Sequence, residues 1–325
     1  MSRRRGIWWA AAIVLAALAV ASIGLGSVHI APAAVLSALA GAGDPGTVTI
    51  VRVLRLPRVA MAILLGAGLG MSGASLQGVM RNPLAEPYLL GVSGGAAVGA
   101  VIAVLVGAPA VLVPIAAFIG AVLAVAVAFF VAHATPGGGD VRVLLMAGVI
   151  VGAFANAAIM LLLANADPAA MRGALWWMMG SVAAATWAQN GWLAFYVLAG
   201  GALLVAWARE IDILTLGEDA AASLGLDADR ASRRVYLMAS LVAAATVAAA
   251  GLVGFVGLVV PHIARRMGAS ASRAVILGSA LIGAALVVGS DLIARTALPP
   301  AELPLGAVTA VIGVPFFLIQ LRRLR

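Results

Sequence analysis

The stretch PRVAMAILLGAGLGMSGASLQGVM, residues 57–80, decides the fold of this chain. It holds a single charged residue, Arg58, near its beginning. Since an α-helix rises 1.5 Å per residue, about 20 apolar residues cross the roughly 30 Å hydrocarbon core of a bilayer. Gly66, Gly70 and Ala74 recur at four-residue spacing, which lets a second helix approach closely. The stretch predicts a membrane-spanning helix that packs tightly against its neighbours.

The composition agrees with a bilayer as the solvent. Hydrophobic residues make up 64% of the 325 positions, charged residues only 10%, and the mean hydropathy is +1.14. Soluble domains carry about 25% charged residues because their surface meets water. The net charge of +8 lies in short Arg clusters between apolar runs, which is typical of cytoplasmic loops rather than of nucleic-acid binding. We therefore expect an all-α polytopic membrane protein.

Two missing residue types exclude whole classes of chemistry. Cys is absent, so the chain has no disulfides and no cysteine metal site. All 20 basic residues are Arg, whereas a Walker A loop needs a Lys on the nucleotide phosphates. The chain therefore cannot be a standard P-loop ATPase, and any energy from ATP must come from a separate subunit.

Eight apolar runs have the length of a membrane crossing. They are residues 7–28, 57–80, 88–106, 110–132, 143–164, 191–208, 274–292 and 303–321. A further run, 235–260, can be one tilted helix or a full span followed by a short one, since Gly251, Gly254 and Gly257 permit a break.

The positions of the Arg residues decide between these readings, because Arg concentrates on the cytoplasmic side. With the amino terminus inside and ten crossings, 15 of the 20 Arg lie inside, whereas nine crossings leave ten on each side. We therefore expect ten transmembrane helices, both termini in the cytoplasm, and one membrane domain over residues 1–325.

The spans lack the groups that ion coupling or hydrolysis needs. Away from their ends they contain no Asp, Glu, Lys or Arg, and an ion-coupled transporter needs such a group or a His to carry its ion. The three His residues lie far apart in the sequence, which argues against a metal site. Gln77 and Asn156 are the notable polar residues within spans, and hydrogen bonds between helices explain both.

Two loop regions stand out. The loop 209–234 contains a short predicted helix at 217–225, bounded by glycines, with Glu218 and Asp219 where the helix dipole favours acids. Its exposed Leu224 and its alanines suit either a plain solvated loop or the docking of a cytoplasmic partner. On the outer side of the membrane, three arginines depart from the rule that Arg concentrates on the cytoplasmic side: Arg52, Arg55 and Arg58.

These outer arginines have two explanations. They either anchor the chain at lipid headgroups or form a cationic rim that receives an acidic protein. Arg295 joins them from the outer end of the ninth span, and Asp291, four residues earlier, suits a pair along that helix.

The motifs together resemble the FecCD family of ABC importer permeases, which includes vitamin B12, ferric-siderophore and haem permeases. The matching segments are RLPRVAMAILLGAGLGMSGASLQGVMRNPLAEPYLLGVSGGAAVGA from Arg55, WWMMGS from Trp176, LGEDAAASLGL from Leu216, GFVGLVVPHIAR from Gly254, DLIAR from Asp291 and AELPLGAVTAVIGVPFF from Ala301. The resemblance implies a type II importer in the bacterial inner membrane. Its partners would be a second permease copy as a homodimer, a cytoplasmic ATPase dimer that uses ATP, and a periplasmic binding protein. This chain itself would bind no cofactor.

The resemblance also implies residue roles. The coupling helix that enters the ATPase would use Gly217, Glu218, Ala221, Leu224 and Gly225. The arginines that receive the binding protein would be Arg55, Arg58 and Arg295. The cytoplasmic gate would use Asn82, Pro83 and Leu84, near a loop where Asp140 and Arg142 replace the family's small hydroxyl residues.

The cargo stays open between ferric siderophore, haem and cobalamin. Trp176, Trp177, Met178 and Met179 either contact a large apolar chelate or anchor the chain at the membrane interface. The alternative function is an ion-coupled secondary transporter, whose uptake would survive ATP depletion. A structural or receptor-like membrane protein would show no flux at all.

Overall fold

The fold is a bundle of helices in a computed structural model that describes residues 2–26, 28–135 and 141–322. The long helices are α1 (Ser2–Gly24), α4 (Leu56–Val79), α6 (Leu112–Ala134), α7 (Val141–Ala164), α9 (Trp187–Ala206), α12 (Ala228–Ala250), α14 (Ser272–Thr296) and α15 (Leu305–Arg322). The shorter ones are α2 (Pro32–Leu39), α3 (Pro45–Thr49), η1 (Ile50–Arg55), η2 (Pro87–Leu90), α5 (Val92–Leu105), α8 (Pro168–Met178), α10 (Ala208–Thr215), α11 (Glu218–Ser223) and α13 (Val256–Arg266).

Every apolar run expected to cross the membrane coincides with a helix. Within the described residues, seven helical segments are long and apolar enough to cross a membrane. The other three, α5, α13 and the apolar part of α15, are shorter than a full crossing. The all-helical membrane fold is therefore confirmed, while the count of ten crossings stays a prediction.

Helix α4 forms the centre of the bundle and contacts α9, α12, α13 and α14. It approaches α14 at backbone distance: a methyl group on Gly66 would lie 2.1 Å from the carbonyl oxygen of Gly283. One turn further along α4, a methyl group on Gly70 would lie 2.3 Å from the carbonyl oxygen of Ser279. The predicted close packing of this glycine ladder is confirmed.

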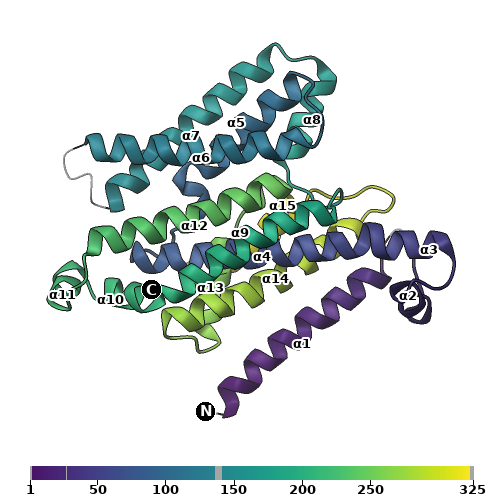
Figure 1. Cartoon of the computed structure of the whole chain (residues 1–325), viewed down its shortest axis with the longest axis horizontal. Helices are drawn as coiled ribbons and strands as arrows, with labels where there is room; N and C mark the ends of the chain where they lie inside the picture. Colours follow the sequence, from purple (N-terminus) through teal and green to yellow (C-terminus); the bar gives the residue numbers. More distant parts are fainter. Residues whose placement is uncertain (1, 27, 136–140, 323–325) are drawn as a thin grey trace.

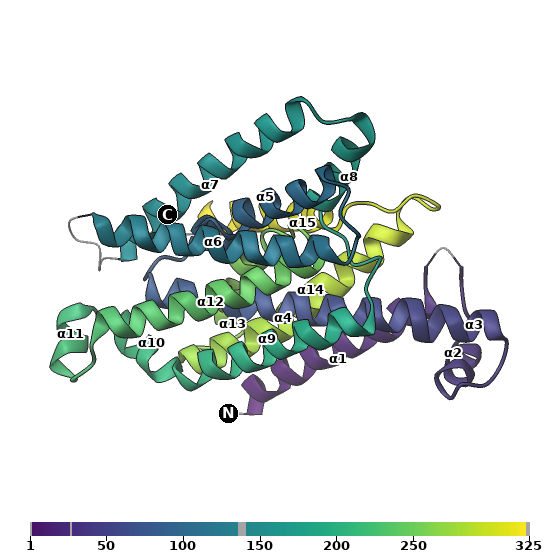
Figure 2. The same ribbon diagram turned by 45° about the horizontal axis from the view of Figure 1, so that its top comes forward.

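The helices form two layers, which Figures 1 and 2 show from directions 45° apart. Helices α5 to α8 make one layer, and α4, α9, α12 and α14 make the other, with α1 along its outer side. Helix α11 projects at one end of the bundle and α2 and α3 at the opposite end (Figure 1). The two ends of the bundle thus carry different short helices.

The run 235–260 is broken, as the glycines indicated. Helix α12 ends at Ala250, and α13 begins at Val256. Gly251 has φ +72°, and Phe255 has φ +68°, both in the left-handed region where helices stop. The reading as two helices is confirmed.

The loop 209–234 is more helical than expected. Helix α10 follows α9 almost without interruption, and α12 already begins at Ala228. Between them α11 occupies the predicted position, with Gly217 at φ +111° before it and Gly225 at φ +76° after it. These two glycines set α11 apart from the helices on both sides.

Candidate translocation and coupling sites

The break between α12 and α13 joins segments that lie far apart in the sequence. The backbone N–H of Ser181 donates to Ala250 O at 2.8 Å, so the end of α8 is tied to the end of α12. The N–H groups of Leu305 and Gly306 donate to Gly180 O and Met179 O, both at 3.0 Å. The WWMMGS and AELPLG motifs therefore meet at the break.

The segment between α4 and α5 holds the break from its other side. The Tyr88 hydroxyl accepts from the N–H of Val253 at 2.8 Å and donates to the carbonyl of the same residue at 3.0 Å. A Glu86 carboxylate oxygen accepts from the N–H of Phe255 at 2.9 Å. These bonds satisfy peptide groups that a continuous helix would have paired, which a bilayer interior demands.

The same segment receives a second contact from α13, since His262 Nε2 lies 3.0 Å from Pro83 O. Gln77 joins the site as well: its amide donates to Leu258 O at 3.1 Å, and Arg265 donates to its carbonyl oxygen at 2.7 Å. The helix-to-helix role predicted for Gln77 is confirmed.

The predicted gate residues lie at the end of α4 near α11. The N–H of Leu84 donates to Asn82 Oδ1 at 2.9 Å, and both Pro83 and Leu84 are exposed. Asp140, in the loop expected close to the gate, lies outside the described residues. Sequence reasoning missed Arg81, whose guanidinium donates to Glu218 at 3.2 Å. This ion pair joins the predicted gate segment directly to the predicted coupling helix.

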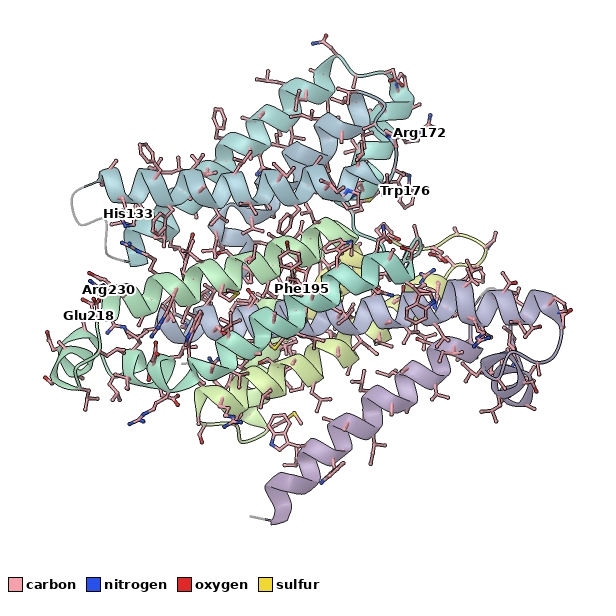
Figure 3. All side chains as sticks on the ribbon, in the orientation of Figure 1. His133, Arg172, Trp176, Phe195, Glu218 and Arg230 are labelled. Atoms are coloured by element: carbon pink, nitrogen blue, oxygen red, sulfur yellow. The ribbon has the colours of Figure 1, made fainter. Side chains whose placement is uncertain are left out.

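Two exposed leucines flank α11. The side chain of Leu224 is 62% exposed and that of Leu216, which the sequence did not single out, is 67% exposed. Ala221 has no exposed surface, so it seats α11 on the bundle and offers no contact to a partner. Ala222 on the same helix is exposed, and the docking role predicted for this segment stays a prediction. Figure 3 shows Glu218 at this end and Trp176 at the far end.

Arg58 and Arg295 form a buried network with two carboxylates. Arg58 contacts Asp291 through Nε and Nη2 at 3.0 and 2.8 Å, and it binds Glu302 through Nη1 at 2.9 Å. Arg295 pairs with the same Asp291 at 3.5 Å, as the spacing along the helix predicted. The docking role that the resemblance implied for Arg55, Arg58 and Arg295 stays a prediction.

Arg55 binds the carboxyl-terminal end of helix α1. Its guanidinium donates to Ile23 O at 2.7 Å and to Gly24 O at 2.9 Å, and also contacts Val28 O. Ile23 and Gly24 lie in the last turn of α1, where carbonyl groups lack helical partners. Of the outer arginines near α4, only Arg52 is exposed.

The tryptophan and methionine motif is divided by burial. Trp176 is 53% exposed, whereas Trp177 and Met178 are partly buried against a cluster formed by α5, α7 and α8. The two explanations weighed from the sequence, chelate contact and interfacial anchoring, both fit Trp176. Trp177 and Met178 mainly hold α8 in place.

A polytopic helical bundle with a broken helix at its centre and a helical projection at one end defines a membrane-embedded transport subunit. No group of three His, Cys, Asp or Glu residues that could hold a metal ion occurs in the described part of the chain. The chain belongs to the FecCD transport family, whose sequence model matches residues 14–323. Like its relatives, it is a permease subunit of an ABC importer. It is therefore a transport subunit and not an enzyme.

Three curated relatives cover most of this chain. The chain is 42% identical to the cobalamin import system permease protein BtuC of Halobacterium salinarum over 86% of its own length and 75% of the relative. It is 36% identical to the Fe(3+)-citrate import system permease protein YfmE of Bacillus subtilis, over 96% of this chain and 93% of the relative. It is 38% identical to the hemin transport system permease protein HmuU of Yersinia pestis, over 84% and 83%.

Two solved structures share the fold. One is assigned to a metal-chelate type ABC transporter in an inward-facing conformation; it matches with a TM-score of 0.88 and 26% identity, over 98% of this chain and 99% of the other. The second, PsaBC from Streptococcus pneumoniae in complex with Fab, matches with a TM-score of 0.55 and 16% identity, over 81% and 89%. The second likeness concerns the fold alone.

Proposed function

We propose that this permease moves a metal chelate across the bacterial inner membrane into the cytoplasm, as a single membrane domain that crosses the bilayer ten times. Three relatives that carry different cargoes, cobalamin, hemin and Fe(3+)-citrate, support the substrate class because each cargo is a metal held in an organic ligand. The distribution of Arg supports cytoplasmic termini, with 15 of 20 on that side. The α11 end of the bundle is then cytoplasmic.

The observation that carries the mechanism is α11, a short helix set apart by two glycines and joined to the gate segment by the Arg81–Glu218 pair. A cytoplasmic ATPase dimer binds α11 through the exposed Leu216 and Leu224. When ATP binding closes that dimer, α11 moves, and the motion passes through Arg81 to residues 82–84. The permease binds no cofactor in this scheme, and its partner uses the ATP.

A second copy of the chain completes the path as a homodimer, with the broken helix region at its wall. Irregular backbone at membrane depth is tolerated where protein buries it or where it lines a cavity. Asn82, Pro83 and Leu84 form the cytoplasmic gate, and Trp176 meets the chelate on the outer side. This division leaves most of the choice of cargo to the binding protein, because the spans offer few hydrogen-bonding groups.

A periplasmic binding protein docks at the α2–α3 end. Arg52 is the exposed cation there, while Arg55, Arg58 and Arg295 form the buried support beneath it. Arg58 is the buried arginine that an acidic partner can reach most easily, because its ligand Glu302 is 43% exposed.

Reconstitution in liposomes tests this function. The permease, its ATPase and its binding protein should accumulate one or more of cobalamin, haem and a ferric siderophore when ATP is present. Leu224→Asp should abolish uptake and leave folding intact, because it places a charge in the apolar contact with the ATPase. Leu298→Asp is the matched control for ATPase binding, which it should leave intact in a pull-down with the ATPase, since Leu298 is 59% exposed and lies away from α11. Failure of all three cargoes would refute the metal-chelate proposal.

The same assay separates the alternative class. An ion-coupled transporter would keep its uptake after ATP depletion and lose it when the ion gradient collapses. The importer proposed here would show the reverse, and Leu224→Asp would behave like ATP depletion.

A further inference from the structure

An apolar groove lies between α6 and α12, outside the sites described above. Its volume is about 540 Å³, and Val125, Phe129, Phe130, Leu241 and Ala244 form much of its wall. This volume is in the range of pockets that hold small molecules. Phe130 is 74% exposed beside it, so the groove opens on the side that faces lipid. It therefore suits an apolar ligand that enters from the bilayer.

The groove has the length of one bilayer leaflet. Along α6 its lining extends from Val122 to His133, which is about 16 Å at 1.5 Å per residue. Half of the hydrocarbon core is about 15 Å. An acyl chain that starts at the α11 end of the groove would fit within the leaflet on that side.

Basic side chains stand at the mouth of the groove. Arg230, Arg233, Leu237, Leu241 and Ala244 recur on one face of α12 at three- and four-residue spacing, so the two arginines continue the line of the groove. Figure 3 shows Arg230 of α12 and His133 of α6 at the same end of the bundle.

The arginine nearest the mouth is held in place by neutral groups. The Arg233 guanidinium lies 5.1 Å from the centre of the Phe129 ring, a cation–π distance. Its Nη2 donates to His133 Nε2 at 2.6 Å, while the other ring nitrogen donates to Phe129 O at 2.9 Å, so this imidazole is the neutral tautomer. Within the described residues no carboxylate pairs with Arg233. Its positive charge is thus oriented but not neutralised there.

A polar group inside the groove points to a ligand with an acceptor. Ser240 is 1% exposed and lines the groove, and its hydroxyl has no hydrogen-bond partner among the described residues. An unpaired buried hydroxyl is costly, since its hydrogen bond to water is lost on folding. A ligand that carries ester oxygens next to apolar chains would satisfy it.

We propose that this groove binds an anionic phospholipid, with one acyl chain between α6 and α12 and the phosphate at Arg233. Charge and shape both favour this occupant, because the groove is apolar along its length and cationic only at its mouth. The assignment to the cytoplasmic leaflet rests on the orientation proposed above, whereas the site itself does not.

Native mass spectrometry of the full-length permease in mild detergent tests the proposal, with phosphatidylglycerol and phosphatidylcholine of identical chains as probes. The wild type should retain one phosphatidylglycerol in preference to phosphatidylcholine. Arg233→Gln should weaken this retention about fivefold, the effect of one basic residue near an anionic lipid. Ala244→Phe should prevent it by filling the groove, and the exposed Arg273→Gln on α14 should leave it unchanged.

Three results would overturn the proposal. One is equal retention of the two lipids. Another is retention of phosphatidylglycerol that neither Arg233→Gln nor Ala244→Phe changes. If the Ala244→Phe variant does not fold, Leu237→Trp takes its place, because Leu237 is 40% exposed at the rim of the groove. The third is loss of phosphatidylglycerol when the complete transporter assembles, which would make the groove an interface with another protein.

Discussion

Substitution of Asp291 should cost far more stability than substitution of Glu302, although both carboxylates bind the same Arg58. The side chain of Asp291 is 3% exposed and that of Glu302 is 43% exposed. Asp291→Asn removes the carboxylate that Arg58 and Arg295 share, and breaking such a buried pair costs roughly 3–5 kcal/mol. Glu302→Gln removes a half-exposed pair, which contributes only about 0–1 kcal/mol.

The assay is unfolding of the purified permease in detergent, followed by circular dichroism against temperature and denaturant. The Arg52→Gln variant is the control, because Arg52 is exposed and makes no ion pair within the described residues. Equal losses for Asp291→Asn and Glu302→Gln, or a wild-type midpoint for Asp291→Asn, would refute the buried network as a stabilising element.

The same variants test the docking role. Glu302→Gln frees one side of the Arg58 guanidinium, so an acidic binding protein that uses Arg58 should bind this variant more tightly. Arg52→Gln should weaken that binding without loss of stability. Surface plasmon resonance with the permease in nanodiscs measures both, and unchanged affinity for the two variants would move the docking site away from these arginines.

Three further substitutions probe the centre of the bundle and the coupling end. Gly66→Ala should lower the free energy of unfolding by about 1–3 kcal/mol or more, because its methyl group meets the backbone of α14. Gly191→Ala is the control and should leave this free energy unchanged, because no atom lies within 4 Å of its new methyl group. Denaturant titration measures both. Glu86→Ala should lower the free energy of unfolding by about 1–3 kcal/mol, because it leaves the N–H of Phe255 at the helix break without its partner, as melting curves will show. Arg81→Glu should reduce ATP-driven uptake in liposomes, and the exchanged pair Arg81→Glu with Glu218→Arg should restore it, unless the contact plays no part in coupling.

The sequence predicts the elements of this fold well because lipid imposes simple rules. Long uncharged runs must be helices, and four-residue glycine spacing must be a contact face. The break after α12 could also be predicted, because the excess of Arg on one side required an extra crossing and Gly251 permitted it. Each of these inferences needs only the local sequence and the direction of the chain.

The contacts between distant segments could not be predicted in the same way. Arg55, Arg58 and Arg295 were recognisable as arginines on the outer side, but their burial depends on carbonyls of α1 and on Glu302, which no spacing brings together. Arg81 looked like an ordinary cytoplasmic charge until the structure placed it beside Glu218. Sequence patterns report which residues share a helix face, whereas these partners come from other helices.

The glycine contacts between α4 and α14 also limit how this protein can move. With Gly66 against Gly283 and Gly70 against Ser279, the two helices cannot slide past one another without first separating by the thickness of a peptide group. They should therefore travel as one rigid body through the whole transport cycle. Spin labels on the two helices would keep a constant separation with and without ATP. The distance from a label on either helix to one on α7 or α11 would change with ATP.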